Sequence, residues 1–182
     1  MLNLKGLKSF FLSRFAKPTG DRGLDRVVRT GLNRRIVEIG VGDAQRAKQI
    51  LQLAVRLADG QPVWYTGIDL FESRPQRDGL DLKQAYKLLR PTGARVQLVP
   101  GDPLTALSRV ANSLQRTDLL IISADISAES MKRAWFYVPR MLHATSQVFA
   151  EVPGEEPGTL ALQPLSIAEV QARAILPRRR AA

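Results

Sequence analysis

The chain has 182 residues, no cysteine, 45% hydrophobic and 24% charged residues, and a formal net charge of +10. This length and composition are typical of one soluble domain with a substantial core. The lack of cysteine excludes disulfides, thiolate metal sites and cysteine nucleophiles. No apolar run approaches the roughly 18 to 20 residues that a membrane-spanning helix needs. We therefore expect a soluble, cytoplasmic protein with no transmembrane segment.

The positive charge is concentrated at the two ends of the chain. Residues 1–35 carry a net charge of +7 and residues 173–182 carry +4, whereas the segment between them carries −1. Basic ends of this kind either contact nucleic acid or an anionic surface, or only keep the chain soluble. The first twenty residues also place apolar side chains at helical spacing. This pattern fits a helix that packs on the domain, a helix that lies on a surface, or a transit-like segment.

Segments with the periodicity of strands and helices alternate along the rest of the chain. The predicted strands are 35–39, 63–68, 96–99, 119–122, 147–152 and 159–162. The predicted helices are 21–29, 43–57, 80–89, 104–114, 127–142 and 166–175, the last opened by a capping box at Ser166 and Glu169. Alternation of this kind predicts a three-layer α/β/α sandwich with a mainly parallel, Rossmann-like sheet and right-handed crossovers.

The predicted domain boundaries follow the charge and the periodicity. We expect a basic leader with a short helix at 1–34, an α/β domain at 35–176 and a basic tail at 177–182. Within the domain, Trp64 and Trp135 are expected to pack in the core. His143, near the end of helix 127–142, is expected to interact with the terminal carbonyl groups of that helix.

Acids and glycines follow four successive predicted strands. They are Glu38, Gly40 and Gly42 after the first strand, Asp69 after the second, Gly101 and Asp102 after the third, and Ser123 and Asp125 after the fourth. In an open parallel sheet, ligands bind beyond the carboxyl ends of the strands. Glycine permits a tight turn and the close approach of backbone to a ligand. Caps and turns explain each acid individually, but jointly these residues favour a small-molecule site.

Two common nucleotide sites do not match the sequence. The nicotinamide fingerprint G-x-G-x-x-G would need a third glycine where the chain has Gln45, and Asp69 comes later than its usual acid. A phosphate loop of the form G-x-x-x-x-G-K-[ST] is also missing. We expect no metal site.

The residues from Glu38 to Gly42, together with Asp69 and Gly101-Asp102, resemble the S-adenosylmethionine site of class I methyltransferases. The resemblance covers about residues 35–152. Within it, the stretch Tyr65-Thr-Gly-Ile-Asp-Leu-Phe-Glu72 is similar to the second-strand motif of small-molecule O-methyltransferases. The family usually ends its sheet with two further strands that form an antiparallel edge. We expect one of them to be missing here, or to be supplied by residues 159–165.

The resemblance implies a set of residues that bind S-adenosylmethionine, with S-adenosylhomocysteine as the product. Gly40 and Gly42 would let backbone approach the methionine part, and Glu38 would organise the turn and the amino group of the cofactor. Asp69 would accept hydrogen bonds from both ribose hydroxyls, and Asp102 would meet the adenine amino group. Leu70 and Gly101 complete the set.

The predicted activity is methyl transfer to an unidentified acceptor, with a small-molecule hydroxyl favoured. Asp125 is the best-placed candidate for a general base, because it follows the fourth strand. The alternative is a non-catalytic, methyltransferase-like binding module that uses its basic termini to contact nucleic acid or an anionic surface. We also expect a bulky replacement at Gly40 to abolish cofactor binding and leave the fold intact. The sequence does not indicate an oligomeric state.

Overall fold

The computed structural model describes residues 27–29, 33–75, 79–155 and 159–175. The predicted basic leader therefore lies almost entirely outside the described residues, as does the basic tail at 177–182. Of the predicted helix 21–29, residues 27–29 are described, and they are helical. Within the described ranges, no helix is both long enough and apolar enough to cross a membrane.

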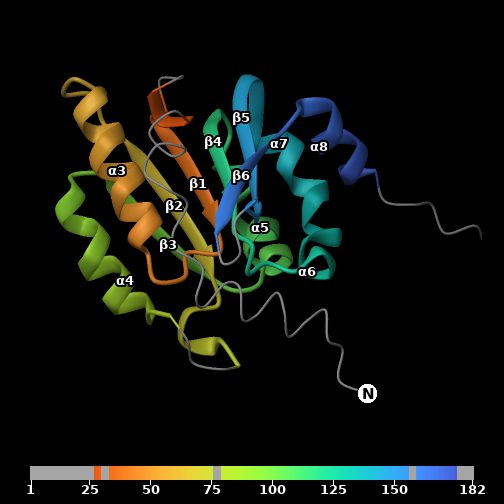
Figure 1. Cartoon of the computed structure of the whole chain (residues 1–182), viewed down its shortest axis with the longest axis horizontal. Helices are drawn as coiled ribbons and strands as arrows, with labels where there is room; N and C mark the ends of the chain where they lie inside the picture. Colours follow the sequence, from red (N-terminus) through yellow and green to blue (C-terminus); the bar gives the residue numbers. More distant parts are fainter. Residues whose placement is uncertain (1–26, 30–32, 76–78, 156–158, 176–182) are drawn as a thin grey trace, which may run out of the picture.

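Six strands form one sheet in the order β3-β2-β1-β4-β5-β6 (Figure 1). Strands β1 to β5 are parallel, and β6 runs antiparallel to β5 at the edge. The strands are β1 (Arg35–Ile39), β2 (Trp64–Asp69), β3 (Arg95–Pro100), β4 (Thr117–Ile122), β5 (Leu142–Pro153) and β6 (Leu160–Leu165). The predicted mainly parallel sheet is confirmed, with a single antiparallel edge strand close to the position expected for it.

Helices cover both faces of the sheet and complete the three layers (Figure 1). One face packs against α3 (Gln45–Leu57) and α4 (Leu82–Leu89). The other face packs against α5 (Pro103–Val110), α6 (Ala128–Lys132), α7 (Val138–Met141) and α8 (Ile167–Ala174). Short 3-10 turns complete the connections: η1 (Phe71–Ser73), η2 (Arg90–Thr92) and η3 (Ala134–Tyr137).

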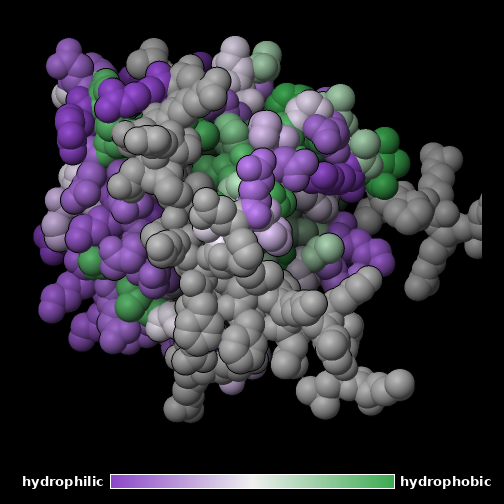
Figure 2. Space-filling model, viewed as in Figure 1, coloured by the Kyte–Doolittle hydropathy of each residue, from purple (hydrophilic) through white to green (hydrophobic). Residues whose placement is uncertain are grey.

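The central strand β1 is apolar on both sides because both of its faces are covered. Ile36 contributes to the core beneath α3, whereas Val37 and Ile39 contribute to the core beneath the opposite helices. A strand buried in this way is encoded by a largely apolar run, which in β1 is interrupted by the buried Glu38. On α3, buried Ile50 and Leu51 face the sheet, and hydrophilic residues cover most of the outer surface over α3 and α4 (Figure 2).

The predicted long helix at 127–142 is wrong. The structure divides this segment into α6, the turn η3 and α7, after which β5 begins at Leu142. Pro139 has no N–H to continue an α-helical hydrogen-bond ladder, so α7 begins afresh beside it. The apolar residues Met131 and Val138 are buried as expected, but they lie on successive short turns.

Two further side-chain predictions are corrected. His143 lies in β5, and its Nε2 is 3.1 Å from Asp118 Oδ1, so it does not cap a helix. Trp64 is only partly buried and lies between the guanidinium groups of Arg35 and Arg95, at 5.3 and 5.2 Å from its ring centre. Trp135 packs against the core as predicted, with Arg173 over its ring.

Candidate functional site

The predicted site residues meet at the carboxyl ends of β1, β2, β3 and β4. Strand β1 pairs with β2 on one side and with β4 on the other, so the order of the sheet reverses between β1 and β4. Ligands of open α/β sheets bind at such a switch point. The glycine turn after β1 therefore lies where the fold places a ligand.

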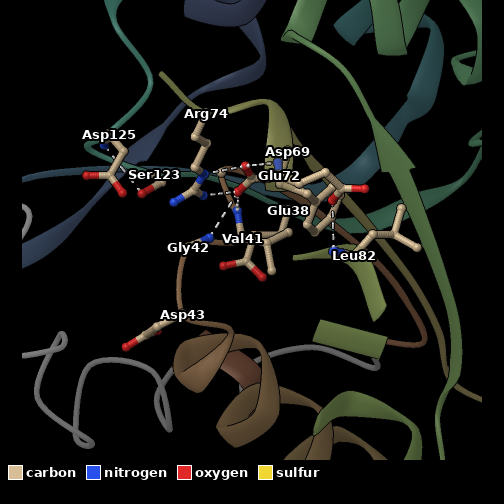
Figure 3. Close-up of polar contacts among 12 residues, drawn as sticks. Glu38, Val41, Gly42, Asp43, Asp69, Glu72, Arg74, Leu82, Ser123 and Asp125 are labelled. Atoms are coloured by element: carbon tan, nitrogen blue, oxygen red, sulfur yellow. Dashed lines mark hydrogen bonds and ion pairs between the residues drawn. The ribbon is translucent and has the colours of Figure 1, made fainter. Parts of the chain in front are cut away.

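Asp69 joins the turn after β1 to the loop after β2 (Figure 3). Its Oδ2 accepts hydrogen bonds from the backbone N–H groups of Val41 at 2.6 Å and Gly42 at 3.0 Å. Its Oδ1 accepts the N–H of Phe71 at 3.1 Å. The residue is buried, with 5% of its surface exposed. One carboxylate thus fixes the position of two loops that border the site.

Arg74 also binds Asp69, through two donors. Its Nε donates to Asp69 Oδ1 at 2.8 Å, and its Nη2 forms a very short ion pair with Asp69 Oδ2. Figure 3 shows the guanidinium pointing at the carboxylate from the side of Ser123 and Asp125. The two-donor contact covers the side of Asp69 that the backbone leaves open.

These contacts decide the protonation state of Asp69. Burial alone would raise its pKa, but the hydrogen bond from Arg74, the N–H of Gly42 and the charge of Arg74 outweigh it and hold the pKa below the ordinary value. Asp69 is therefore ionised near neutral pH, and both of its oxygens already accept from Arg74 and from backbone N–H groups.

The two glycines of the turn are required for different reasons. Gly40 has a φ of +91°, and a Cβ added there would lie 2.6 Å from Ser123 Cβ and 3.0 Å from Ile126 Cγ1. Gly42 has a φ of +62°, and a Cβ there would meet only Asp125 Oδ2, at 4.0 Å. The expectation that Gly40 tolerates a bulky side chain without harm to the fold is therefore wrong, because its place is filled by the loop after β4.

Two of the four described non-glycine residues with a positive φ lie at this end of the sheet, and the other two, Asp59 and Arg116, lie at the opposite end. Ala44 and Phe71 adopt positive φ values of 58° and 50°, which are uncommon for residues other than glycine. Ala44 follows the glycine turn directly, so α3 begins at Gln45 and not at Asp43 as predicted.

A buried ionic network lies beneath the turn. Glu38 is 1% exposed, and its two oxygens accept from Arg46 Nε at 2.7 Å and from the Tyr65 hydroxyl at 2.5 Å. Arg46 also donates from Nη2 to the Gly40 carbonyl at 3.0 Å and pairs through Nη1 with Glu151 at 2.5 Å. The network therefore holds the turn from below, through α3, β2 and β5.

Two carboxylates share one guanidinium in this network. Burial raises the pKa of Glu38 and outweighs the lowering effect of Arg46 and Tyr65. The neighbouring carboxylates raise the pKa of Arg46, against its own burial, so that it stays charged. Burial, together with Glu38, also raises the pKa of Tyr65, which stays a neutral donor.

Glu151 extends the network to the loop that carries Asp125. Its Oε2 accepts from the Ser123 hydroxyl and from the N–H of Ala124, both at 3.3 Å. Asp125 itself is exposed and faces Gly42 across the turn. The predicted general base is thus placed beside the turn, on a loop that is anchored from the core.

Leu70, Gly101 and Asp102 lie in the loops after β2 and β3. Leu70 precedes the turn η1, and Gly101 has a φ of +136°. Asp102 caps α5, accepting the N–H groups of Leu104 and Thr105. Hydrogen bonds from Thr105 and Leu104 hold its pKa below the ordinary value. Its capping role does not depend on a ligand, and its contact with adenine stays a prediction.

Sequence reasoning missed Arg46, Glu151 and Arg74. Arg46 lies one helical turn before Ile50 on the buried stripe of α3, and Glu151 lies in the apolar run of β5, so each interrupts an apolar pattern. A charge in such a position indicates a buried partner. No comparable signal marks Arg74. Among the described residues, no cluster of acids or histidine could hold a metal ion.

Comparison with known proteins gives matches only among solved structures. No family model and no curated protein matches the chain. The cofactor-bound Rv0187 protein from MTB is 17% identical, with a TM-score of 0.54 over 94% of this chain and 75% of that one. The resemblance to class I methyltransferases holds at the level of the fold. At this identity the likeness shows the α/β arrangement and leaves the activity open.

Two other similar structures score slightly lower. A TehB-like SAM-dependent methyltransferase from Corynebacterium glutamicum is 16% identical, with a TM-score of 0.49 over 84% of this chain and 70% of that one. A SAM-dependent methyltransferase from Thiobacillus denitrificans, in complex with S-adenosyl-L-homocysteine, is 15% identical, with a TM-score of 0.49 over 83% and 56%. Because both TM-scores are below 0.5, these two matches add no support to the assignment of the fold.

Replacing Arg46 with Met should destabilise the protein by about 3 to 5 kcal/mol, because it leaves two buried carboxylates without their cation. Urea unfolding followed by circular dichroism measures the change. Arg56→Met, at an exposed position of the same helix, is the control and should stay within about 0.5 kcal/mol of the parent. Equal losses in both variants would contradict a shared buried network.

Because the pKa of Glu38 is raised in the folded state, its contribution to the free energy of unfolding should depend on pH. A carboxylate whose pKa is higher in the folded state loses stabilising free energy as pH rises from its ordinary value of about 4.5 through the folded value. The stability of Glu38→Gln relative to the parent should therefore improve between pH 4.5 and pH 7, as measured by urea unfolding. A difference that does not change with pH would mean that Glu38 has an ordinary pKa.

Proposed function

We propose that this chain binds S-adenosylmethionine at the carboxyl ends of β1, β2 and β3 and transfers its methyl group to a small-molecule acceptor. The observation that carries the proposal is Asp69, an ionised carboxylate fixed against the glycine turn at the switch point of the sheet. A carboxylate with two acceptor oxygens is suited to the vicinal hydroxyls of a ribose.

The contact with Arg74 indicates which groups Asp69 can bind. The guanidinium presents two donors, one to each carboxylate oxygen. A ribose diol also presents two donors, so the arginine acts as an internal stand-in for it. Asp69 can therefore accept the two ribose hydroxyls on one condition: Arg74 must release the carboxylate when the diol binds.

The remaining residues have roles that follow from their positions. Gly42 leaves space above the turn that a side chain would fill, and Asp102 lies at the loop that would face an adenine ring. S-adenosylmethionine supplies a methyl group on a sulfonium, whose neutral thioether is a good leaving group. The protein's main contribution is then alignment of the acceptor with that methyl group.

The charge of this end of the sheet suits a cationic ligand. Asp43, Asp102 and Asp125 lie in the loops, and none of them has an ion pair among the described residues. The other three carboxylates are paired: Arg74 binds Asp69 at the end of β2, and the buried Glu38 and Glu151 share the single charge of Arg46. Such an excess of acid favours a sulfonium and an ammonium group and disfavours a polyanion.

Asp125 is the group that would take a proton from a hydroxyl acceptor. It is exposed, it faces Gly42, and the bonds of Glu151 to Ser123 and Ala124 hold its loop in place. A base within reach of the acceptor proton contributes roughly 100-fold or more to a proton-transfer step.

A pair of substitutions with opposite effects tests the site. Asp69→Asn should weaken the binding of S-adenosylhomocysteine by about 10-fold or more, because hydrogen bonds to a charged acceptor are lost. Arg74→Ala should tighten it by about 3- to 10-fold, because the internal competitor is removed. Calorimetric titration of the full chain measures both. Weaker binding in both variants would indicate only a loosened loop, and no binding by the parent or by Arg74→Ala would reject the site.

A second test uses two glycines in similar backbone conformations. Gly42→Ala places a Cβ above the turn, so it should weaken S-adenosylhomocysteine binding by about 10-fold. Gly60 has a φ of +79° and nothing within 4 Å of an added Cβ, so Gly60→Ala carries a similar backbone cost away from the site. Thermal unfolding should show similar losses for the two variants. Equal affinities in calorimetry would contradict a ligand at Gly42.

A further inference from the structure

We infer that the amino end of the sheet, opposite the candidate site, binds the phosphate backbone of a nucleic-acid strand through Arg35 and Arg95. This surface lies on the far side of the sheet from Asp69, at the first residues of β1, β2 and β3. It adds a docking function to the chain and does not depend on the proposed methyl transfer.

Arg35, Trp64 and Arg95 form one row across three neighbouring strands. Arg35 pairs with Trp64 in register, and Trp64 pairs with Arg95. The two guanidinium groups lie 5.3 and 5.2 Å from the centre of the Trp64 ring. Two strand spacings of about 4.8 Å separate their backbones. Stacking on one ring restricts both arginines and leaves their N–H edges for an anion.

The two arginines have no carboxylate partner in the described part of the chain. Both are exposed, and neither takes part in an ion pair there. Asp118 lies near Arg35, but its oxygens accept the backbone N–H groups of Arg34 and Arg35 and contact His143. The positive charge of the side chains is therefore available to a ligand.

Basic residues surround the row, and acids are few. Arg34, Arg90 and Arg116 are exposed and flank the starts of β1, β3 and β4. Residues 103–117 contain no acid, and Asp118, the next residue, is the acid beside Arg35. Exposed arginines therefore outnumber acids around the row.

The geometry favours a nucleic-acid strand over a lipid surface. A membrane-binding surface presents apolar side chains for insertion. Here the one large apolar side chain of the row, Trp64, has guanidinium groups against its ring, and the exposed large apolar residues Leu57, Tyr86, Phe136 and Ile175 lie outside the row. Restricted arginine forks match phosphates at fixed spacing along a strand.

The test is fluorescence anisotropy of a labelled 20-nucleotide oligo(U) RNA with the full chain, between 50 and 200 mM KCl. The double variant Arg35→Gln/Arg95→Gln should bind at least about 10-fold more weakly at 100 mM KCl. Its plot of log affinity against log salt should be shallower by about 1.4, for two lost phosphate contacts on a single strand. Circular dichroism checks that the variant is folded.

The matched control is Lys83→Gln/Arg133→Gln, which removes two exposed charges from α4 and from the residue after α6. It should change affinity by less than about 2-fold. All variants keep the basic chain ends, so a loss no larger than that of the control would place the binding there and overturn the proposal. Poly-glutamate that competes as well as RNA at the same charge concentration would also overturn the proposal. So would binding to phosphatidylserine vesicles that requires the two arginines while binding to RNA does not.

Trp64→Leu separates positioning from charge. It keeps both arginines and removes the ring between them, so affinity should fall about 3-fold with the salt slope unchanged. An unchanged affinity would contradict the role of the stacked row.

Discussion

The carboxylate of Asp69 is the contact on which the candidate site depends. It leaves the end of β2, receives the backbone N–H groups of Val41 and Gly42 after β1, and binds Phe71 and Arg74 in its own loop. The two loops therefore cannot move independently. The carboxylate that orders the two loops is a charged acceptor, and a ribose diol would donate its hydrogen bonds to the same group.

The network of Glu38, Arg46 and Glu151 gives this arrangement a fixed base. Arg46 reaches the turn through the Gly40 carbonyl, and Glu151 reaches the loop before Asp125 through Ser123 and Ala124. Burying two acids with one base has a desolvation cost, which well-packed hydrophobic residues at the same positions would avoid. Its effect here is to couple the loops after β1 and β4, which border the proposed ligand and acceptor.

Much of the fold follows from local patterns, and most of the polar network does not. Strand β1 has the predicted bounds, because an apolar run ends at Gly40, and the capping box at Ser166 and Glu169 opens α8. The pattern at 127–142 suited one helix or several short turns equally well. The pairing of Arg46 with Glu151 joins residues more than one hundred positions apart, so only the sheet order brings them together. The candidate site acids could be placed from the sequence, but the occupation of Asp69 by Arg74 could not.

The most direct measurement is a crystal structure of the full chain with S-adenosylhomocysteine. The account predicts the ribose hydroxyls within hydrogen-bond distance of Asp69, with the Arg74 guanidinium displaced from both carboxylate oxygens. The bonds from Val41 and Gly42 should remain, because they fix the turn. A ligand bound elsewhere, or bound with Arg74 still paired to Asp69, would contradict the assignment of this carboxylate as the nucleoside-binding group.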